Sequence, residues 1–323
     1  MPALATYELT KDYAVGFWRK RPYRALDSLT LDVEPGEVFG FLGPNGAGKT
    51  TTLKLLMQLV YPTSGRAEIL GRPLGDLRMK RRIGYLPENP YFYDHLTAEE
   101  LLTYFAALFG YSPGERRARA SRLLDEVGVG AERRLQLRKF SKGMLQRIGI
   151  AQALINDPEL VILDEPMSGL DPLGRRDVRA LILRLRDRGC TVFFSSHVLS
   201  DAEALCSRVA ILARGRLVAI GSLTDMVPFR PRGWELVVAG LPDRAVPSAG
   251  PGVRQVVRIG DGRYEVELPL DPSPDRIMAE LAAAGAHIVS LNPVRDTLED
   301  FFVQQVTSAE VLATRRGLED DAR

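Results

Sequence analysis

The sequence predicts an α/β fold in which helices cover both faces of a mostly parallel sheet. Three short apolar runs, at residues 38–42, 160–163 and 191–195, have the length and the continuous hydrophobicity of strands buried on both faces. Segments of helical periodicity separate these runs along the chain. Apolar strands that alternate with helices imply a largely parallel sheet.

The other elements of the N-terminal part follow in order. Residues 29–35 alternate apolar and polar side chains, which predicts a strand that ends at a Pro35-Gly36 turn. Residues 209–220 are typical of a hairpin around Arg214-Gly215. Helical periodicity predicts five helices, at residues 49–60, 97–109, 114–127, 143–154 and 175–188.

The order of these elements predicts two domains. The first covers residues 1–227 and contains a helical subdomain, at about residues 88–155, inserted between the glycine-rich loop and the second apolar strand. A Pro/Gly-rich linker follows at residues 228–233, then a small α+β domain at 234–308 and a polar, frayed tail at 309–323. The elements expected in the small domain are a strand at 234–238, a hairpin at 253–268, a helix at 274–284, a strand at 287–291 and a helix at 297–306.

Length and composition exclude several classes of protein. The 323 residues correspond to two or three domains, and 45% apolar with 26% charged residues excludes wholesale disorder. No apolar run approaches the roughly 18 residues of a membrane span. The N-terminus lacks the pattern of a secretory signal. Cys190 and Cys206 are too few for a disulfide framework and fit a reducing cytosol.

Charge is distributed unevenly along the chain. From Ser222 onward, 11 Arg and no Lys stand against 16 Asp and Glu, which gives a net charge of −5 and leaves +7 for residues 1–221. A basic part suits polyanionic ligands or an anionic membrane surface. A charged surface that is merely solvated explains these numbers equally well, so charge alone does not assign a partner.

The most specific motif is a phosphate-binding loop. The pattern G-x-x-x-x-G-K-[ST] occurs at Gly43-Pro44-Asn45-Gly46-Ala47-Gly48-Lys49-Thr50 and is followed by Thr51. Its backbone N–H groups curl around phosphates, and the next helix points its positive end at them. We expect Lys49 to bridge the β- and γ-phosphates and Thr50 to place its hydroxyl on Mg²⁺. The motif predicts a P-loop NTPase.

Two carboxylates, Asp164 and Glu165, directly follow the apolar run at 160–163. The C-terminal end of a buried strand lies at the edge where ligands of α/β sheets bind. We expect Asp164 to hold Mg²⁺ through water, and Glu165 to polarise a water for in-line attack on the γ-phosphate. The pair is a weak signal alone, and the phosphate loop upstream makes it specific.

Three further motifs complete an ordered set. The chain has Phe140-Ser141-Lys142-Gly143-Met144-Leu145-Gln146-Arg147 between the phosphate loop and the carboxylates, then Ser168-Gly169-Leu170-Asp171 and Ser196-His197. Over about residues 5–225 this order resembles the ATP-binding subunit of an ABC transporter. The motifs match, in turn, Walker A, the signature, Walker B, the D-loop and the switch histidine of that family.

The resemblance implies a dimer of two copies paired head to tail around ATP and Mg²⁺. Each ATP would lie between the phosphate loop of one copy and the signature of the other. There Ser141 and the amide of Gly143 would complete the γ-phosphate cradle. Asp171 would link the two sites across the interface, and His197 would hydrogen-bond the γ-phosphate.

Three positions depart from the family pattern. Lys142 stands where Gly is usual and Met144 where Gln is usual, and the Q-loop carries Glu88 where Gln is usual. Lys142 either adds a cation near the phosphates or is simply solvated. Glu88 can still ligate Mg²⁺ and serve catalysis, but it adds negative charge near the γ-phosphate. Together with the acidic C-terminal part, these departures resemble the subunits of type-2 ABC exporters.

The sequence leaves open which aromatic residue stacks on adenine. The family's aromatic lies some distance before the phosphate loop, and the corresponding segment of this chain, between Tyr13 and Tyr23, is interpreted as containing an insertion. Tyr13 fits the local pattern best, with Phe17 and Tyr23 as alternatives. The aromatics that do not stack are expected to pack in the core.

The resemblance also implies a separate transmembrane permease as partner and a location at the cytoplasmic face of the inner membrane. The run Tyr91-Phe92-Tyr93 follows Glu88 where the family receives the coupling helix of the permease, and clustered aromatics are good anchors for a partner. The alternative is that they form the local core of the helical subdomain. The helix at 297–306 resembles the closing helix of such exporters, and support of the dimer is the preferred role for the C-terminal domain.

A soluble ABC ATPase acting on ribosomes or DNA is the main alternative, but the chain has one ATP-binding domain, and its segment at 88–155 is too short for a long coiled coil. No basic stripe with interleaved aromatics predicts nucleic acid as a partner. A regulatory switch without hydrolysis is disfavoured because Glu165 is present.

Overall fold

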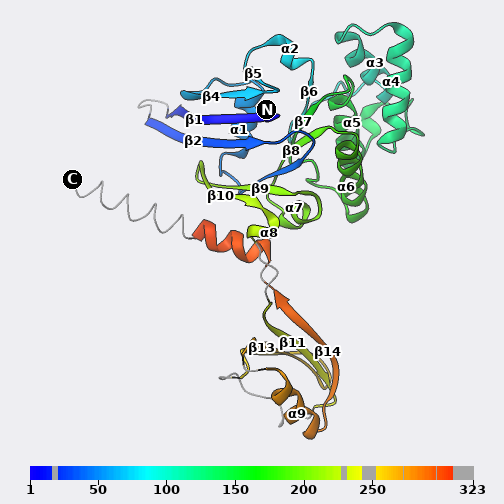
Figure 1. The fold of residues 1–323 in the computed structure, drawn as a ribbon. Helices are drawn as coiled ribbons and strands as arrows, with labels where there is room; N and C mark the ends of the chain where they lie inside the picture. Colours follow the sequence, from blue (N-terminus) through cyan, green and yellow to red (C-terminus); the bar gives the residue numbers. More distant parts are fainter. Residues whose placement is uncertain (17–20, 227–230, 242–251, 272, 296, 308–323) are drawn as a thin grey trace, which may run out of the picture. The chain divides into compact units, whose positions relative to one another are not determined.

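The computed structural model describes the chain except residues 17–20, 227–230, 242–251, 272, 296 and 308–323. The described residues form two compact units, one of residues 1–223 with 302–307, and one of residues 224–301 (Figure 1). In the described part, no helix has both the length and the hydrophobicity to cross a membrane. Residues 228–230 of the expected linker and the expected tail at 309–323 lie outside the described residues.

The centre of the first unit is a six-stranded sheet. Its strands are β3 (Val38–Leu42), β6 (Ile83–Leu86), β7 (Leu160–Asp164), β8 (Thr191–Ser196), β9 (Arg208–Ala213) and β10 (Arg216–Ser222). The order is β10-β9-β3-β8-β7-β6, and every neighbouring pair except β9–β10 is parallel. The predicted α/β fold with a mostly parallel sheet is therefore confirmed, with the three apolar runs as β3, β7 and β8.

A second, antiparallel sheet lies in the same unit. It contains β1 (Leu4–Val15), β2 (Arg21–Val33), β4 (Ser64–Ile69) and β5 (Arg72–Pro73), in the order β2-β1-β4-β5. The sequence predicted only the end of β2. Register shifts interrupt the β1–β2 pairing, and Glu8 and Ser28 have positive φ, so the apolar alternation that identifies a strand is broken.

Seven helices of the first unit are α1 (Lys49–Leu56), α2 (Leu77–Lys80), α3 (Ala98–Leu108), α4 (Pro113–Glu126), α5 (Lys142–Ala153), α6 (Pro172–Asp187) and α7 (Leu199–Leu205). Thr97 and Ser112 form capping boxes at the starts of α3 and α4. Ser141 caps α5 and Asp171 caps α6, which begins three residues before its predicted start because a proline follows the cap. Figure 1 shows α3 and α4 at the end of this unit away from β1 and β2.

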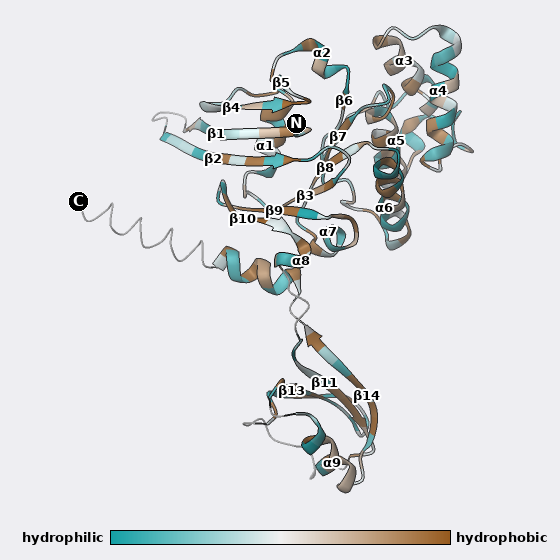
Figure 2. Cartoon of the chain, in the orientation of Figure 1, coloured by the Kyte–Doolittle hydropathy of each residue, from teal (hydrophilic) through white to brown (hydrophobic). Residues whose placement is uncertain are grey.

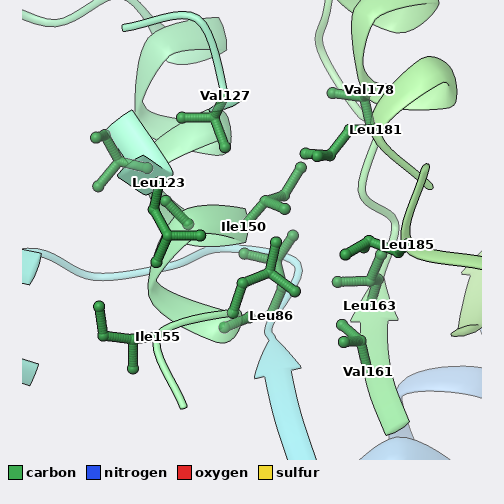
Figure 3. Packing of buried hydrophobic residues seen from close by; sticks show 14 of the residues in the cluster. Leu86, Leu123, Val127, Ile150, Ile155, Val161, Leu163, Val178, Leu181 and Leu185 are labelled. Carbon is green, nitrogen blue, oxygen red and sulfur yellow. The ribbon is translucent and has the colours of Figure 1, made fainter. Parts of the chain in front are cut away.

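Strand β7 shows how the parallel sheet is covered on both faces. Val161 and Leu163 pack into a core with α4, α5 and α6, and Figure 3 shows these side chains meeting. Leu160 and Ile162 point to the opposite core, which α1 and the antiparallel sheet close. Consecutive strand residues face opposite sides, so a continuous apolar run is required here. Figure 2 shows the corresponding hydrophobic strands and the hydrophilic surface of α4.

The second unit is a small α+β fold. Strands β11 (Pro231–Ala239), β12 (Gln255–Gly260), β13 (Arg263–Pro269) and β14 (His287–Arg295) form an antiparallel sheet in the order β12-β13-β11-β14. Helix α9 (Asp275–Ala283) packs on it through Leu281, and the short α8 (Leu223–Met226) precedes it in the chain. Residues 298–301 of this unit are also helical.

The end of the predicted linker is wrong. Residues 231–233 belong to β11, where Gly233 pairs with Pro269. The backbone of Leu268 approaches so closely that a side chain at Gly233 would collide with it. Glycine is required at this strand position, and the Pro/Gly composition that predicted a linker has this other cause.

Candidate functional site

The loop between β3 and α1 is shaped by glycines at close approaches. Gly48 has φ +107° and caps α1, and a side chain there would collide with the carbonyl oxygen of Ala25. A side chain at Gly43 would collide with Leu212. Lys49 is the first residue of α1, and its buried ammonium donates to the carbonyl oxygens of Gly43 (2.7 Å) and Pro44 (3.3 Å). The first residues of the loop therefore fix the position of the Lys49 ammonium at its end.

Asp164 ends β7 and is fixed by the neighbouring strand. Its Oδ1 accepts a hydrogen bond from the Ser195 hydroxyl at 2.6 Å, and that hydroxyl oxygen accepts one from the backbone N–H of Glu165 at 3.0 Å. Its Oδ2 is buried and has no hydrogen-bond partner in the described part of the chain. A buried carboxylate oxygen without a donor is a ready ligand for a cation.

The electrostatics of Asp164 indicate which groups surround it. Burial raises its pKa, and the nearby hydroxyls of Ser195 and Thr50 act against that rise. The carboxylates of Glu88 and Glu165 raise the pKa of Asp164 further. Thr50, Glu88 and Asp164, which the sequence predicts as metal ligands, are thus close in space.

Glu165 lies between two basic groups. Its Oε1 is 3.4 Å from the ammonium of Lys49, and its Oε2 is 2.9 Å from Nδ1 of His197. Its backbone has φ +48°, a region that non-glycine residues rarely occupy and that is often found at active sites. This turn directs the side chain back toward Lys49 and His197.

A cavity of about 510 Å³ brings most of the predicted residues together, and we call it the nucleotide cavity. It is lined by the phosphate loop with Glu88, Glu165, His197 and Ser168, and by two tyrosines. Gly43 and Asp164 are not among the lining residues. The lining residues are Tyr13, Tyr23, Ala25, Pro44, Asn45, Gly46, Ala47, Gly48, Lys49, Thr50, Thr51, Glu88, Glu165, Ser168 and His197.

The two tyrosines are direct neighbours. Tyr13 of β1 pairs with Tyr23 of β2 in the antiparallel register, so both rings project from the same face of the sheet. The side chain of Lys11 also lies over the Tyr13 ring, 5.0 Å from its centroid. Two of the three predicted aromatics therefore reach the nucleotide cavity, and the third, Phe17, lies outside the described residues.

The signature residues line a different cavity of about 390 Å³, which we call the signature cavity. Ser141, Lys142, Gly143 and Asp171 belong to it, and none of them lines the nucleotide cavity of the same chain. The Ser141 hydroxyl accepts from the N–H of Met144, and Asp171 accepts from the N–H of Gly174. Within the described part of the chain, the side chain of Lys142 is exposed and makes no hydrogen bond or ion pair.

Comparison with known proteins identifies the family. A family model described as ABC transporter matches residues 26–168. The chain is 46% identical over 303 residues to an uncharacterized ABC transporter ATP-binding protein of Synechocystis sp., covering 93% of this chain and 84% of that protein. The chain belongs to the ABC transporter ATP-binding proteins. This ATPase family matches the resemblance found in the sequence.

Two further similarities bear on this ABC ATPase. It is 33% identical to the linearmycin resistance ATP-binding protein LnrL of Bacillus subtilis, over 85% of this chain and 91% of that protein. It also resembles a dimeric ATP-binding cassette solved in a post-hydrolysis state with ADP and inorganic phosphate. That likeness has a TM-score of 0.63 and 26% identity, over 68% of this chain and 98% of the cassette. This chain is thus an ATP-binding, ATP-hydrolysing protein.

The residues of this ABC ATPase fit Mg²⁺ bound together with nucleotide. Mg²⁺ is usually held by one or two carboxylates or hydroxyls, with phosphate oxygens and water as the other ligands. Thr50, Glu88 and the unpartnered Oδ2 of Asp164 offer that set. No group of three or more His, Cys, Asp or Glu that could hold a metal ion occurs in the described residues.

Sequence reasoning missed Ser195 as a site residue. It predicted residues 191–195 only as a buried strand, although Ser195 connects Asp164 to the backbone of Glu165. A signal was present, because two consecutive serines interrupt the end of an otherwise apolar strand. The pairing of Asp164 with Ser195 in the β7–β8 register is a property of the sheet.

Proposed function

We propose that this ABC ATPase acts as a dimer that binds two Mg-ATP and drives conformational change in a separate membrane permease for export. The observation that carries the proposal is the division of the predicted site between two cavities. The nucleotide cavity holds the phosphate loop and the carboxylates, and the signature cavity holds Ser141, Lys142, Gly143 and Asp171. A second copy arranged head to tail supplies the missing half, and the dimeric cassette with ADP and phosphate supports this.

In this proposal each residue has a defined chemical task. Lys49 and the loop amides bind the β- and γ-phosphates, and Thr50, Glu88 and Asp164 hold Mg²⁺. Glu165 accepts a proton from the attacking water, with its orientation set by Lys49 and His197. Ser141 and the amide of Gly143 at the start of α5 approach the γ-phosphate from the partner. Glu88 adds negative charge that the bound metal offsets.

Two further observations support a permease partner and export. Tyr91 is 93% exposed and Tyr93 is 49% exposed, whereas Phe92 between them is buried. The rings of Tyr93 and Tyr104 meet edge to face, with 6.2 Å between their centroids, and this pair extends an exposed aromatic surface over α3. The name of LnrL, a resistance protein, favours outward transport. With a permease as partner, the ATPase works at the cytoplasmic face of the inner membrane.

The substitution Glu165→Gln tests the catalytic and dimer assignments together. It keeps the shape of the side chain and removes its basicity, so we expect ATP binding to persist and turnover to fall by about 100-fold or more. The dimer should accumulate with Mg-ATP, because hydrolysis no longer separates the copies. Phosphate release and light scattering after gel filtration measure both effects. Unchanged turnover, or a monomer at saturating Mg-ATP, would contradict the proposal.

A further inference from the structure

Asp201 is a buried charge that the site described above leaves without a task. It lies in the first turn of α7, four residues after His197, and is 1% exposed. Its Oδ1 accepts hydrogen bonds from Nε (3.1 Å) and Nη2 (2.5 Å) of Arg179, and its Oδ2 lies 4.0 Å from Nη1 of Arg175. Since burying a carboxylate is costly without such partners, the ion pairs fix α7 against α6 at a defined orientation.

The segment between His197 and Asp201 leaves little freedom. The Ser196 hydroxyl accepts from the N–H of Val198 at 2.9 Å and lies 3.2 Å from the carbonyl oxygen of the same residue. This closes a tight turn around His197. The backbone N–H of Asp201 in turn donates to the carbonyl oxygen of Val198. The position of α7 is therefore coupled to the position of His197 through the three residues between His197 and Asp201, which these hydrogen bonds hold.

A small cavity of about 70 Å³ connects the ion pair to the reacting groups. Glu165, Gly169, Arg175, His197 and Asp201 all line it. A displacement of Arg175 or Asp201 would therefore change the shape of the cavity beside the contact between Glu165 and His197.

We propose that Asp201 is a positioning residue for ATP hydrolysis, which holds the His197 imidazole against Glu165 by anchoring α7 to Arg179 and Arg175 of α6. Helix α6 begins at the D-loop, where Asp171 caps it. The ion pairs thus connect the D-loop to the switch histidine within one chain. The inference rests on the proposed roles of Glu165 and His197.

The substitution Asp201→Asn removes the charge and keeps the size of the side chain. The fold should survive, because Arg179 is about one third exposed and can turn its guanidinium into water. We expect kcat to fall about 10- to 100-fold with KM for ATP changed less than about twofold, since misplacing a catalytic contact by about 1 Å has that cost. The matched control is Asp157→Asn, which removes a carboxylate held by Arg119 and Arg122 outside both site cavities.

Histidine NMR gives a readout that general destabilisation would not change. The chain has three histidines, His95, His197 and His287, so the imidazole resonances can be assigned by substitution. In Asp201→Asn the ring signal of His197 should lose the signature of the bond to Glu165, while His95 and His287 keep their signals. If Asp201→Asn does not fold, the variant with both Asp201→Asn and Arg179→Gln removes both charges and should show the same loss.

The outcomes separate this inference from the proposed function. If Glu165→Gln abolishes turnover while Asp201→Asn turns over normally with an unchanged His197 signal, the inference is wrong and the proposed function stands. If Asp157→Asn lowers kcat as much as Asp201→Asn, the effect is general and the inference is also wrong. If Glu165→Gln retains turnover, the proposed function itself fails.

Discussion

The nucleotide cavity and the surface of the helical segment around α3 and α5 differ in how their charged and aromatic residues are exposed and paired. In the nucleotide cavity Lys49 and Glu165 are buried and pair with each other, and Lys49 also donates to a loop carbonyl oxygen. On the helical surface Lys142 and Tyr91 are exposed, and Lys142 makes no polar contact in the described chain. Charged groups that pair within one chain keep their geometry without a second protein.

This difference indicates how the protein divides its work. A preorganised cavity can bind nucleotide in a single copy, because its reorganisation was completed during folding. Exposed aromatics and an unpaired cation at a helix start gain from a partner that covers them. The nucleotide cavity should therefore bind nucleotide in the monomer, and the helical surface should contribute only in an assembly.

The largest expected effect is a loss of ATP turnover after a substitution in the signature cavity, which separates hydrolysis by the dimer from binding by the monomer. Gly143→Asp places a carboxylate at the start of α5, where the γ-phosphate of the partner is expected. We expect turnover to fall at least about 100-fold, as for the loss of an essential oxyanion donor, with ATP binding to the monomer unchanged. Phosphate release and nucleotide-binding titration measure the two quantities.

A matched control is available at the start of another helix. Gly114→Asp makes the same substitution in the first turn of α4, where an added side chain has open space. It should leave turnover within about twofold of the unsubstituted protein. Weaker ATP binding by monomeric Gly143→Asp would show that the signature cavity serves its own chain.

A smaller effect is expected at the exposed aromatics. Tyr91→Ala and Tyr93→Ala should weaken association with the permease about tenfold or more, because exposed tyrosines often dominate interfaces. ATP binding should survive in both. Recovery of the membrane protein that co-purifies from detergent-solubilised membranes measures the association, with Tyr61→Ala as a control at another exposed tyrosine. Undiminished recovery by both variants would remove this surface from the interface.

The smallest expected effect is a weaker affinity for ATP after loss of either tyrosine of the nucleotide cavity. Tyr13→Ala and Tyr23→Ala should each weaken ATP binding by about two- to tenfold, the range for loss of one aromatic contact. The larger loss identifies the ring that carries most of the stacking on adenine. Tyr7→Ala is the control, since Tyr7 contacts Arg66 and does not line the cavity. Normal affinity in both variants would exclude stacking by either ring.

Sequence patterns predicted local features better than distant ones. The runs that became β3, β7 and β8 are buried on both faces, so hydrophobicity alone identified them. Strand β6 escaped prediction, since it has four residues that include Gly84 and Tyr85 and lies at the edge of the sheet. The sequence leaves open whether the run Tyr91-Phe92-Tyr93 lies in the core or on the surface. In the structure Phe92 is buried, whereas Tyr91 and Tyr93 are exposed.

The sequence by itself determined the phosphate loop, the carboxylates after β7 and the caps of the helices, because each depends on residues close together in the chain. The tertiary structure alone decided that Ser195 holds Asp164, that Asp201 binds Arg179 and that the signature residues line a cavity of their own. These contacts join residues about twenty or more positions apart. Their geometry follows from strand register and helix packing, which no local pattern encodes.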